Sequence, residues 1–509
     1  MKGKTLAIIL SISLAGSMAG CGICNKKGNI SSVVVTLPSF EEPEAGFDPV
    51  HGWGMGDNLH DPLIQSTLTT TTEDLKLKND LAVDYTVSED GLTWTVTIRD
   101  DVRFTDGKKL TANDVAFTYN ECKDSGAPND LMLLKRAEAI DDATVKFHME
   151  RPFNIWPYTM AQVGIVPKYA YGPDYGKNPI GSGRYKLKKW DRGKEAIFEA
   201  NPDYYGDEIK MKNIHVKFLT EKKSYQAAEN KDTDVAYISA GYAGRKLKGY
   251  QLKEVTAVDT LGMNLPVEEL SLRRAVNVGI DRDKIVDKVL KGYGTPAYTI
   301  CDQTPWYQEE AETVCDPEQA KEILEEAGWN IGDDQIRERD GKRAEFNLWF
   351  DSSDEIEEKL AKEISDQLLT LGMRVNPTAA KWTDVCKNAQ TQPAVRGVGS
   401  YTPMELYKIY HSDKETGSSR YSSYANPSVD KYMDEALEAP SFETSYELWR
   451  KAQWDGDTGI NGDLPWIWLC NMEHLYFVKD DLQTGDKDIH PHGQGWSLLN
   501  HVDQWQWMH

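Results

Sequence analysis

Apolar and polar residues recur along the chain with two different periods, which predict strands in some segments and helices in others. Val33–Leu37 is a continuous apolar run, typical of a buried strand. Thr93–Ile98 alternates between polar and apolar residues, which predicts a strand with one buried face. Ser182–Trp190 and Lys194–Glu199 predict a hairpin whose turn is Asp191–Gly193. The first half of the chain is therefore predicted to contain several strands.

From Ser271 onward, the apolar residues follow the helical period more often. Pro317 favours the first turn of a helix over Glu318–Ala327, which the next glycine ends. Glu355–Leu371 predicts a long amphipathic helix, and Pro465–Leu469 predicts a buried strand. Because strands and helices interleave without an internal repeat, the sequence indicates the α/β class.

The N-terminus has the pattern of an export signal. Two lysines precede an apolar run over Leu6–Ala15, which is too short to span a membrane. Ser17–Cys21 then forms a small-residue cleavage site that ends in cysteine and resembles the bacterial lipoprotein box. The resemblance implies that Cys21 carries a lipid anchor. We expect residues 1–21 to be a signal peptide, 22–32 a flexible tether, and the mature protein to be exported and lipid-anchored, periplasmic or on the outer face of the cell membrane.

Length and charge narrow the range of partners. A chain of 509 residues exceeds one comfortable hydrophobic core, so two or three domains are expected. The formal net charge is −23. Because phosphate binding requires a basic face, this charge argues against nucleic acid as a partner, and equally against docking on anionic lipid headgroups.

The cysteines leave one pairing open. Cys21 and Cys24 have the C-x-x-C spacing, but they lie at the cleavage site and not at the start of a helix in a βαβ unit, which disfavours a redox role. Cys301 and Cys315 flank one loop, and the alternatives are a disulfide that closes this loop or two free thiols.

Motifs of known enzymes are missing from the sequence. It contains no H-E-x-x-H, G-x-S-x-G or P-loop pattern, and Gly181–Gly183 has the wrong spacing for a nucleophile elbow. His51–Gly56 is rich in glycine but lacks the G-x-G-x-x-G spacing of a dinucleotide site. The sequence therefore predicts neither catalysis nor a bound cofactor.

A series of segments in fixed order resembles the family 5 extracellular solute-binding proteins of ABC importers, which bind oligopeptides, dipeptides or nickel. The resemblance covers the chain from about Val33 to its end, and Arg184 departs from it by replacing the usual proline. The segments that carry it are Asn79–Ala82, Ser88–Trp94, Ile98–Gly107, Leu110–Val115, Pro179–Tyr185, Asn201–Gly206, Leu272–Val276, Ile280–Arg282 and Asp316–Ala320.

The resemblance implies a type II periplasmic-binding-protein fold, in which two lobes close on a ligand about a hinge and a small extra domain lies on the first lobe. The expected first lobe is discontinuous and the second is continuous. Closure would bury a small peptide or metal chelate, and an ABC permease in the membrane would receive the closed, monomeric protein. The expected boundaries are 33–63, 166–267 and 477–509 for the first lobe, 64–165 for the accessory domain, and 268–476 for the second lobe.

The choice between ligands depends on one segment of the second lobe. Peptide binders of this family usually pair the peptide α-amino group with a carboxylate in a stretch where Asp precedes Pro. Thr402 has that place here, so Glu405 would have to supply the charge. The resemblance implies ligand contacts from the following residues: Trp53, Gly54, Tyr401, Thr402, Met404, Glu405, Tyr407 and Trp496. Trp466 and Trp468 are assigned to the core.

Histidines favour the alternative ligand, a nickel ion or nickel chelate, because imidazole is a common ligand of nickel, copper and zinc. His490 and His492 stand close together near the expected lobe junction, and His411 follows the Tyr401–Tyr410 stretch. A solvated His-Pro-His loop without metal is the competing interpretation. A third class of function, a signalling receptor with the same body, also stays open.

Overall fold

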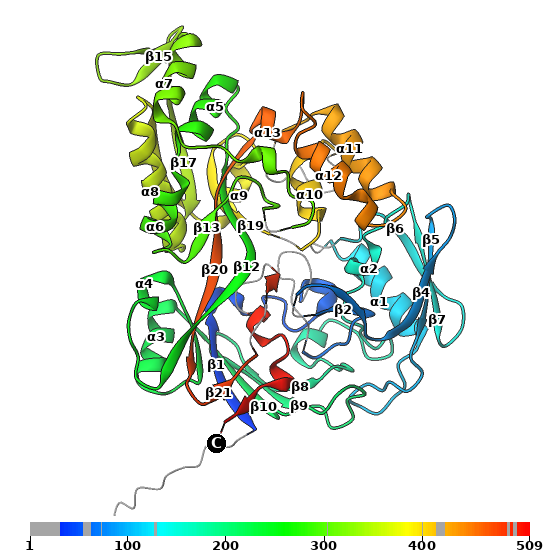
Figure 1. The fold of residues 1–509 in the computed structure, drawn as a ribbon. Helices are drawn as coiled ribbons and strands as arrows, with labels where there is room; N and C mark the ends of the chain where they lie inside the picture. The colour runs from blue at the N-terminus through cyan, green and yellow to red at the C-terminus, as the bar shows by residue number, and fades with distance from the viewer. Residues whose placement is uncertain are drawn as a thin grey trace, which may run out of the picture.

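One mixed sheet runs through most of the molecule (Figure 1). The computed structural model describes residues 31–53, 63–72, 74–126, 130–302, 304–399, 401–413, 423–485, 489–491 and 496–508. Within these residues, ten strands of the sheet lie in the order β18, β17, β19, β12, β20, β11, β1, β10, β9 and β8. Their bounds are Arg374–Ala380, Glu345–Asp351, Ala394–Val398, Tyr250–Asn264, Trp466–Lys479, Val235–Ile238, Ser32–Pro38, Asn213–Leu219, Glu195–Ala200 and Tyr185–Asp191.

Strands β12 and β20 are long and antiparallel, and they join the two halves of this sheet. β19 pairs with the end of β12 near Asn264, whereas β11 pairs with the opposite end of β20, near Lys479. Figure 1 shows the two strands running side by side from the upper half to the lower half of the molecule. Two short strands add to them: β13 (Gly294–Pro296) pairs with β20, and β22 (His490–Pro491) pairs with β12.

Helices pack against both halves of the sheet. α8 follows β17, begins at the N-cap Asp354 and buries Leu360, Ile364 and Leu368 along one face, which confirms the predicted amphipathic helix. α7 begins at Pro317, as predicted, with Asp316 as N-cap. The helices of these two halves are α3 (Glu221–Glu229), α4 (Ala240–Ala243), α5 (Leu270–Gly279), α6 (Arg282–Val289), α7 (Pro317–Glu326), α8 (Glu355–Leu369) and α9 (Trp382–Asn388).

A separate antiparallel sheet lies at the right of Figure 1, in the order β4, β5, β7 and β6. β5 has the bounds Thr93–Ile98, as its alternating pattern predicts. α1 packs on this sheet, and its N-cap Thr111 and Asp114 form a reciprocal capping box. The bounds are β4 Ala82–Val87, β6 Leu134–Ala139, β7 Thr144–Met149, α1 Ala112–Asp124 and α2 Trp156–Thr159.

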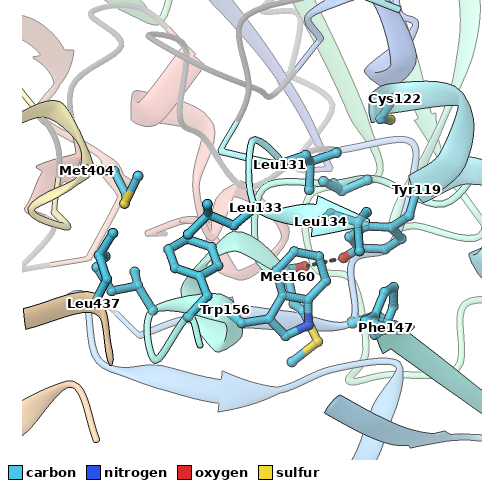
Figure 2. Packing of buried hydrophobic residues seen from close by; sticks show 14 of the residues in the cluster. Tyr119, Cys122, Leu131, Leu133, Leu134, Phe147, Trp156, Met160, Met404 and Leu437 are labelled. Atoms are coloured by element: carbon cyan, nitrogen blue, oxygen red, sulfur yellow. Dashed lines mark hydrogen bonds between the residues drawn. The ribbon is translucent and has the colours of Figure 1, made fainter. Parts of the chain in front are cut away.

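The helices α10 to α12 share a hydrophobic core with this antiparallel sheet. Met404 of α10 and Leu437 of α11 belong to the same buried cluster as Phe147 and Trp156, part of which Figure 2 shows. A second cluster fills the half around α5 to α8, and a third fills the half around β1 and β10. The bounds are α10 Met404–Tyr410, α11 Pro427–Glu438, α12 Tyr446–Gln453 and α13 Ile460–Asp463. The division into lobes at the expected boundaries stays a prediction.

The remaining described elements are short. Two two-stranded sheets and one three-stranded sheet lie outside the large sheets. Their strands are β2 Thr69–Thr71, β3 Leu77–Asn79, β14 Asn330–Ile331, β15 Arg337–Arg339, β16 Lys342–Arg343, β21 Leu482–Gln483 and β23 Gln506–Trp507. The 3₁₀ turns are Ser39–Glu41, Pro49–His51, Tyr175–Lys177, Glu309–Ala311, Glu443–Ser445, Trp496–Leu499 and Val502–Gln504. None of the described helices has the length and apolarity that a membrane crossing requires.

Two features of the sequence receive a structural explanation here. Arg184, which departs from the family pattern, forms a buried ion pair with Asp503 near the C-terminus, with Nη1 and Oδ1 2.7 Å apart. The disulfide alternative for Cys301 and Cys315 is not formed, and both are free thiols. Cys301 packs in a hydrophobic core, whereas Cys315 directs its sulfur toward the carbonyl oxygen of Gly279.

Candidate ligand site at the junction of two parallel strand sets

Two sets of parallel strands direct their carboxyl ends toward the same stretch of β12 and β20. β1, β10 and β11 form one set, and β17, β18 and β19 form the other. Ile238, at the end of β11, pairs with Leu475, while Val398, at the end of β19, pairs with Thr260, which in turn pairs with Asn471. The two ends are therefore four residues apart along β20, or about 14 Å. Ligands of open α/β sheets bind at the carboxyl ends of strands.

We call this region the junction and define it by the polar and aromatic residues that end or follow these strands, with two from the long strands between them. Six lie on the parallel strands or in the segments that follow them, and Asp259 and His474 lie on β12 and β20. The junction residues are Glu221, Tyr237, Asp259, Asp354, Glu357, Trp382, Arg396 and His474.

Carboxylates from both strand sets converge near Tyr237. Burial raises the pKa of its phenol well above the ordinary value, and the carboxylates of Glu221, Asp354 and Asp259 raise the pKa further. The pKa of Glu221 is itself raised, by burial first and then by the charges of Glu355 and Asp354. Because Glu221 follows β10 and Asp354 follows β17, the two strand sets lie within electrostatic reach of each other. The surroundings of Tyr237 are therefore negative.

The junction also contains a positive group. Arg396 in β19 is only 3% exposed, and its guanidinium lies 4.4 Å from the ring centroid of Trp382. Glu357 accepts a hydrogen bond from the backbone N–H of Asp351 at 2.8 Å. Burial and the nearby Asp354 raise the pKa of Glu357 to about 8, although the Arg396 charge acts in the opposite direction. Glu357 is therefore largely protonated at neutral pH.

A buried polar cluster lies between the strand sets, where β12 bulges between Thr256 and Thr260. His474 Nε2 is 3.2 Å from Asp259 Oδ2, and His474 Nδ1 is 3.0 Å from His490 Nδ1. Since one of these two Nδ1 atoms must donate and the other accept, the rings share one proton. Burial lowers the pKa of His490 well below its ordinary value, and the charges of His474 and Lys253 add to the effect. The cluster therefore connects β12, β20 and β22 at the junction.

The segment between β19 and α10 passes very close to β12. A Cβ atom added at Gly399 would lie 1.8 Å from the carbonyl oxygen of Val258. Tyr401 and Thr402 follow, and both are buried, with exposed fractions of 9% and 2%. Glu405 is also buried and lies 3.9 Å from the Lys408 ammonium, which contacts Asp130 at 2.5 Å. The carboxylate expected to replace the missing aspartate is thus already close to a lysine.

Four of the predicted ligand contacts pack inside the protein. Trp53 and Trp496 form an edge-to-face pair with ring centroids 4.7 Å apart in the core around β1. Met404 lies in the core that α10 shares with the antiparallel sheet, and the Tyr407 hydroxyl contacts Arg151 and Asp434. Aromatic size explains this placement, because indole rings stabilise a core through the area they bury. Ligand contact by these four residues, and by Gly54 outside the described residues, stays a prediction.

The predicted metal ligands have separate partners. His411 stacks on Tyr407 and lies 3.3 Å from Asp434, whereas His490 contacts His474. His492 and the lipid-anchor residue Cys21 are outside the described residues. Among the described residues, no group of three or more His, Cys, Asp or Glu side chains is arranged to hold a metal ion.

The sequence reasoning missed the junction residues on the central strands. Arg396 stands alone in the apolar run of β19, and Asp259 interrupts the apolar second half of β12. A single charged residue within a buried strand is the signal that could have revealed each, because such a charge requires a partner or a function. Arg396 and Asp259 lie on neighbouring strands only because β19 pairs with β12 in the tertiary structure.

Comparison with known proteins gives a consistent result over nearly the whole chain. The family described as bacterial extracellular solute-binding proteins, family 5 Middle, matches residues 76–430. Protein XP55 of Streptomyces lividans is 30% identical over 505 residues, which cover 94% of this chain and 91% of XP55. The oligopeptide-binding protein AppA of Bacillus subtilis is 29% identical over 408 residues, covering 74% of this chain and 75% of AppA.

Solved structures show the same mixed α/β fold, that of the type II periplasmic binding proteins. NikZ from Campylobacter jejuni, in complex with Ni(L-His), superposes with a TM-score of 0.80 at 22% identity and covers 94% of this chain and 99% of NikZ. AppA from Bacillus subtilis, in complex with a nonapeptide, superposes with a TM-score of 0.74 at 23% identity, with the same coverage. The predicted fold class is confirmed.

Proposed function

The chain belongs to the family 5 bacterial extracellular solute-binding proteins, and we propose that it captures a small peptide at the junction and delivers it to the membrane permease of an ABC importer. This family consists of transport proteins that bind substrates and are not enzymes. In the proposal, the two halves of the molecule move as lobes about β12 and β20, and a ligand that contacts both strand sets favours the closed state.

The observation that carries the proposal is that the junction contains groups of both charges. Glu221 and Asp354 are half-buried carboxylates that suit an ammonium group, and Arg396 suits a carboxylate. A zwitterionic short peptide carries both complementary charges, an ammonium group for these carboxylates and a carboxylate for Arg396. In this scheme Asp354 supplies the charge that Thr402 cannot.

The names of relatives support the same class of ligand. AppA of Bacillus subtilis is named an oligopeptide-binding protein, and GsiB of Salmonella typhi, 26% identical over 449 residues, is named a glutathione-binding protein. A nickel chelate remains the second candidate, because the NikZ structure holds Ni(L-His).

Calorimetry with matched peptides tests the proposal. Trialanine should bind saturably, and N-acetylation or C-terminal amidation should each weaken its binding about tenfold or more, because one charge-assisted contact is lost. Asp354→Asn should remove the preference for the free amine while keeping the N-cap bonds of α8, and Arg396→Gln should remove the preference for the free carboxylate. Asp366→Asn, on the exposed side of α8, is the matched control.

Two outcomes would contradict the proposal. Binding of nickel with histidine, without binding of any short peptide, would assign the protein to metal-chelate import. Equal affinity for free and N-acetylated trialanine in the unmodified protein would remove the ammonium site. Native mass spectrometry of protein purified without refolding adds an independent readout, since a co-purified ligand reveals its mass.

Membrane attachment is a separate part of the proposal. We infer from the lipoprotein pattern that the lipid on Cys21 holds the protein at the cell membrane beside the permease. Cys21→Ala should move the protein from the membrane fraction to the soluble fraction of the cell envelope or the medium. Unchanged fractionation would contradict the anchor and leave the ligand proposal intact.

A further inference from the structure

A pocket of about 640 Å³ that none of the junction residues lines is found in the seam between the antiparallel sheet and the loop that joins α11 to α12. One wall comes from the turn after β4 and from the segment around Asn154, and the other comes from residues 438–443. We call it the seam pocket and define it by Tyr85, Trp94, Asn154, Tyr158, Phe442 and Glu443. Its walls are separated by almost three hundred residues in the sequence.

Hydrogen bonds hold the two walls together. The Asn154 side-chain amide donates to the carbonyl oxygens of Ala436 and Ala439, at 2.8 and 3.0 Å. The backbone N–H of Asn154 donates to the carbonyl oxygen of Leu437 at 3.1 Å. Arg151 pairs with Asp434 on the same helix, with Nη1 and Oδ1 2.5 Å apart. The pocket is therefore bounded by fixed backbone on both sides.

Aromatic rings form the inner surface of the pocket. Tyr85 and Trp94 lie with ring centroids 6.1 Å apart on the antiparallel sheet. Tyr158 and Phe442 meet edge to face across the seam, with centroids 5.3 Å apart. Trp94 and Phe442 are nearly buried, whereas Tyr85 and Tyr158 are half exposed. Two aromatic pairs thus line one space.

A carboxylate accompanies these rings. Burial, together with the charges of Tyr446 and Glu443, raises the pKa of Tyr158 to about 12. Burial and the Glu443 charge also raise the pKa of Tyr85. Glu443 is exposed and has no ion pair among the described residues, and none of the described residues lining the pocket is basic. The pocket therefore combines aromatic faces with uncompensated negative charge.

We propose that the seam pocket binds a methylated or quaternary ammonium group, independently of the ligand at the junction. Such a group is large, weakly hydrated and positive, so it gains from aromatic faces through the cation–π interaction and from a nearby carboxylate. A primary ammonium or a metal ion gains less here, because it is strongly hydrated and the pocket offers rings in place of many oxygen ligands. The proposal goes beyond peptide capture and does not depend on it.

Choline and its neutral isostere 3,3-dimethylbutan-1-ol are the probes, used with the full mature protein in titrations followed by NMR. Choline should bind with a Kd on the order of 1 mM or tighter, and the isostere about tenfold more weakly or not at all. Glu443→Gln should weaken choline binding about tenfold, while Glu435→Gln, on the neighbouring helix α11 and outside the pocket lining, should not. Absence of saturable choline binding up to about 50 mM would overturn the proposal.

Two further variants separate the aromatic contribution from folding and from the junction. Tyr85→Phe keeps the ring and should bind choline like the unmodified protein, whereas Tyr85→Leu should lose most of the affinity. Choline binding should persist in Asp354→Asn and in the presence of saturating trialanine. Loss of choline binding in Asp354→Asn would place choline at the junction and overturn the seam site, whereas failure of peptides to bind would contradict only the proposed function.

Discussion

Replacing Glu357 by glutamine should remove most of one pH-dependent step in the stability of the protein. Glu357 is only 6% exposed, and burial, with the Asp354 charge, raises its pKa from the ordinary 4.5 to about 8. The native protein therefore keeps a proton that the unfolded chain releases. As a result, the free energy of unfolding decreases as the pH rises from 4.5 toward 8 and is greatest, with respect to this group, below 4.5.

The size of the effect follows from the two pKa values. Each pH unit between them corresponds to about 1.4 kcal/mol, and the unfolded chain is already partly ionised at pH 5. The loss of stability between pH 5 and pH 8 is then about 3 kcal/mol from Glu357 alone. Glutamine cannot ionise, and its side-chain oxygen can still accept the hydrogen bond from the backbone N–H of Asp351.

Urea unfolding at pH 5, 6, 7 and 8 measures this difference. The unmodified protein and Glu357→Gln should have similar free energies of unfolding at pH 5 and diverge to about 3 kcal/mol at pH 8, with the variant more stable. Glu355→Gln, which changes an exposed carboxylate in the first turn of the same helix, should follow the unmodified protein. Parallel pH profiles for the unmodified protein and Glu357→Gln would refute the reasoning.

Two other substitutions test the structure around the junction and at the C-terminus. Gly399→Ala should lower the free energy of unfolding by about 3 kcal/mol, because its Cβ would lie 1.8 Å from the Val258 oxygen, whereas Gly244→Ala, with no atom within 4 Å, should change it little in urea unfolding. Asp503→Asn should lower the melting temperature and cost about 3 kcal/mol, because it leaves the Arg184 charge buried without its carboxylate. A melting temperature equal to that of the unmodified protein would contradict this role of the ion pair.

Local sequence patterns predicted those elements that bury only one face or that begin at a strong capping signal. β5 alternates between buried and more exposed residues along its length, so its bounds follow from the period of two. α7 begins at a proline that an aspartate caps, which is a purely local signal. Such elements were predictable because the interactions that define them lie within a few residues.

Strand β12 was not predicted, although it is fifteen residues long. Its first half is largely exposed or half-buried and its second half is buried on both faces, so no single period describes it. Asp259 and Gly262 also interrupt the apolar run. Gly262 allows Trp468 to approach, since an added Cβ would lie 2.6 Å from that ring. Only the pairing with β20 and β19 explains these residues.

The candidate site was likewise only partly predictable from the sequence. The family resemblance directed attention to the segment around Tyr401 and Thr402, which the structure places beside the end of β19. It did not indicate Asp354 or Glu357, because both look like ordinary acidic residues at the start of an amphipathic helix. Asp354 raises the pKa of Glu221, which lies more than a hundred residues away in the sequence, and Glu357 lies near Arg396 of β19.

The sequence by itself predicted the α/β class and several of the strands and helices, because each depends on the order of neighbouring residues. Only the tertiary structure decided that Trp53 and Trp496 pack in a core, that carboxylates from both strand sets lie near Tyr237, and that Arg396 lies near Glu357. The physical reason is that burial and electrostatic interaction depend on distance in space. Residues far apart in the chain acquire these properties only when β12 and β20 bring the two strand sets together.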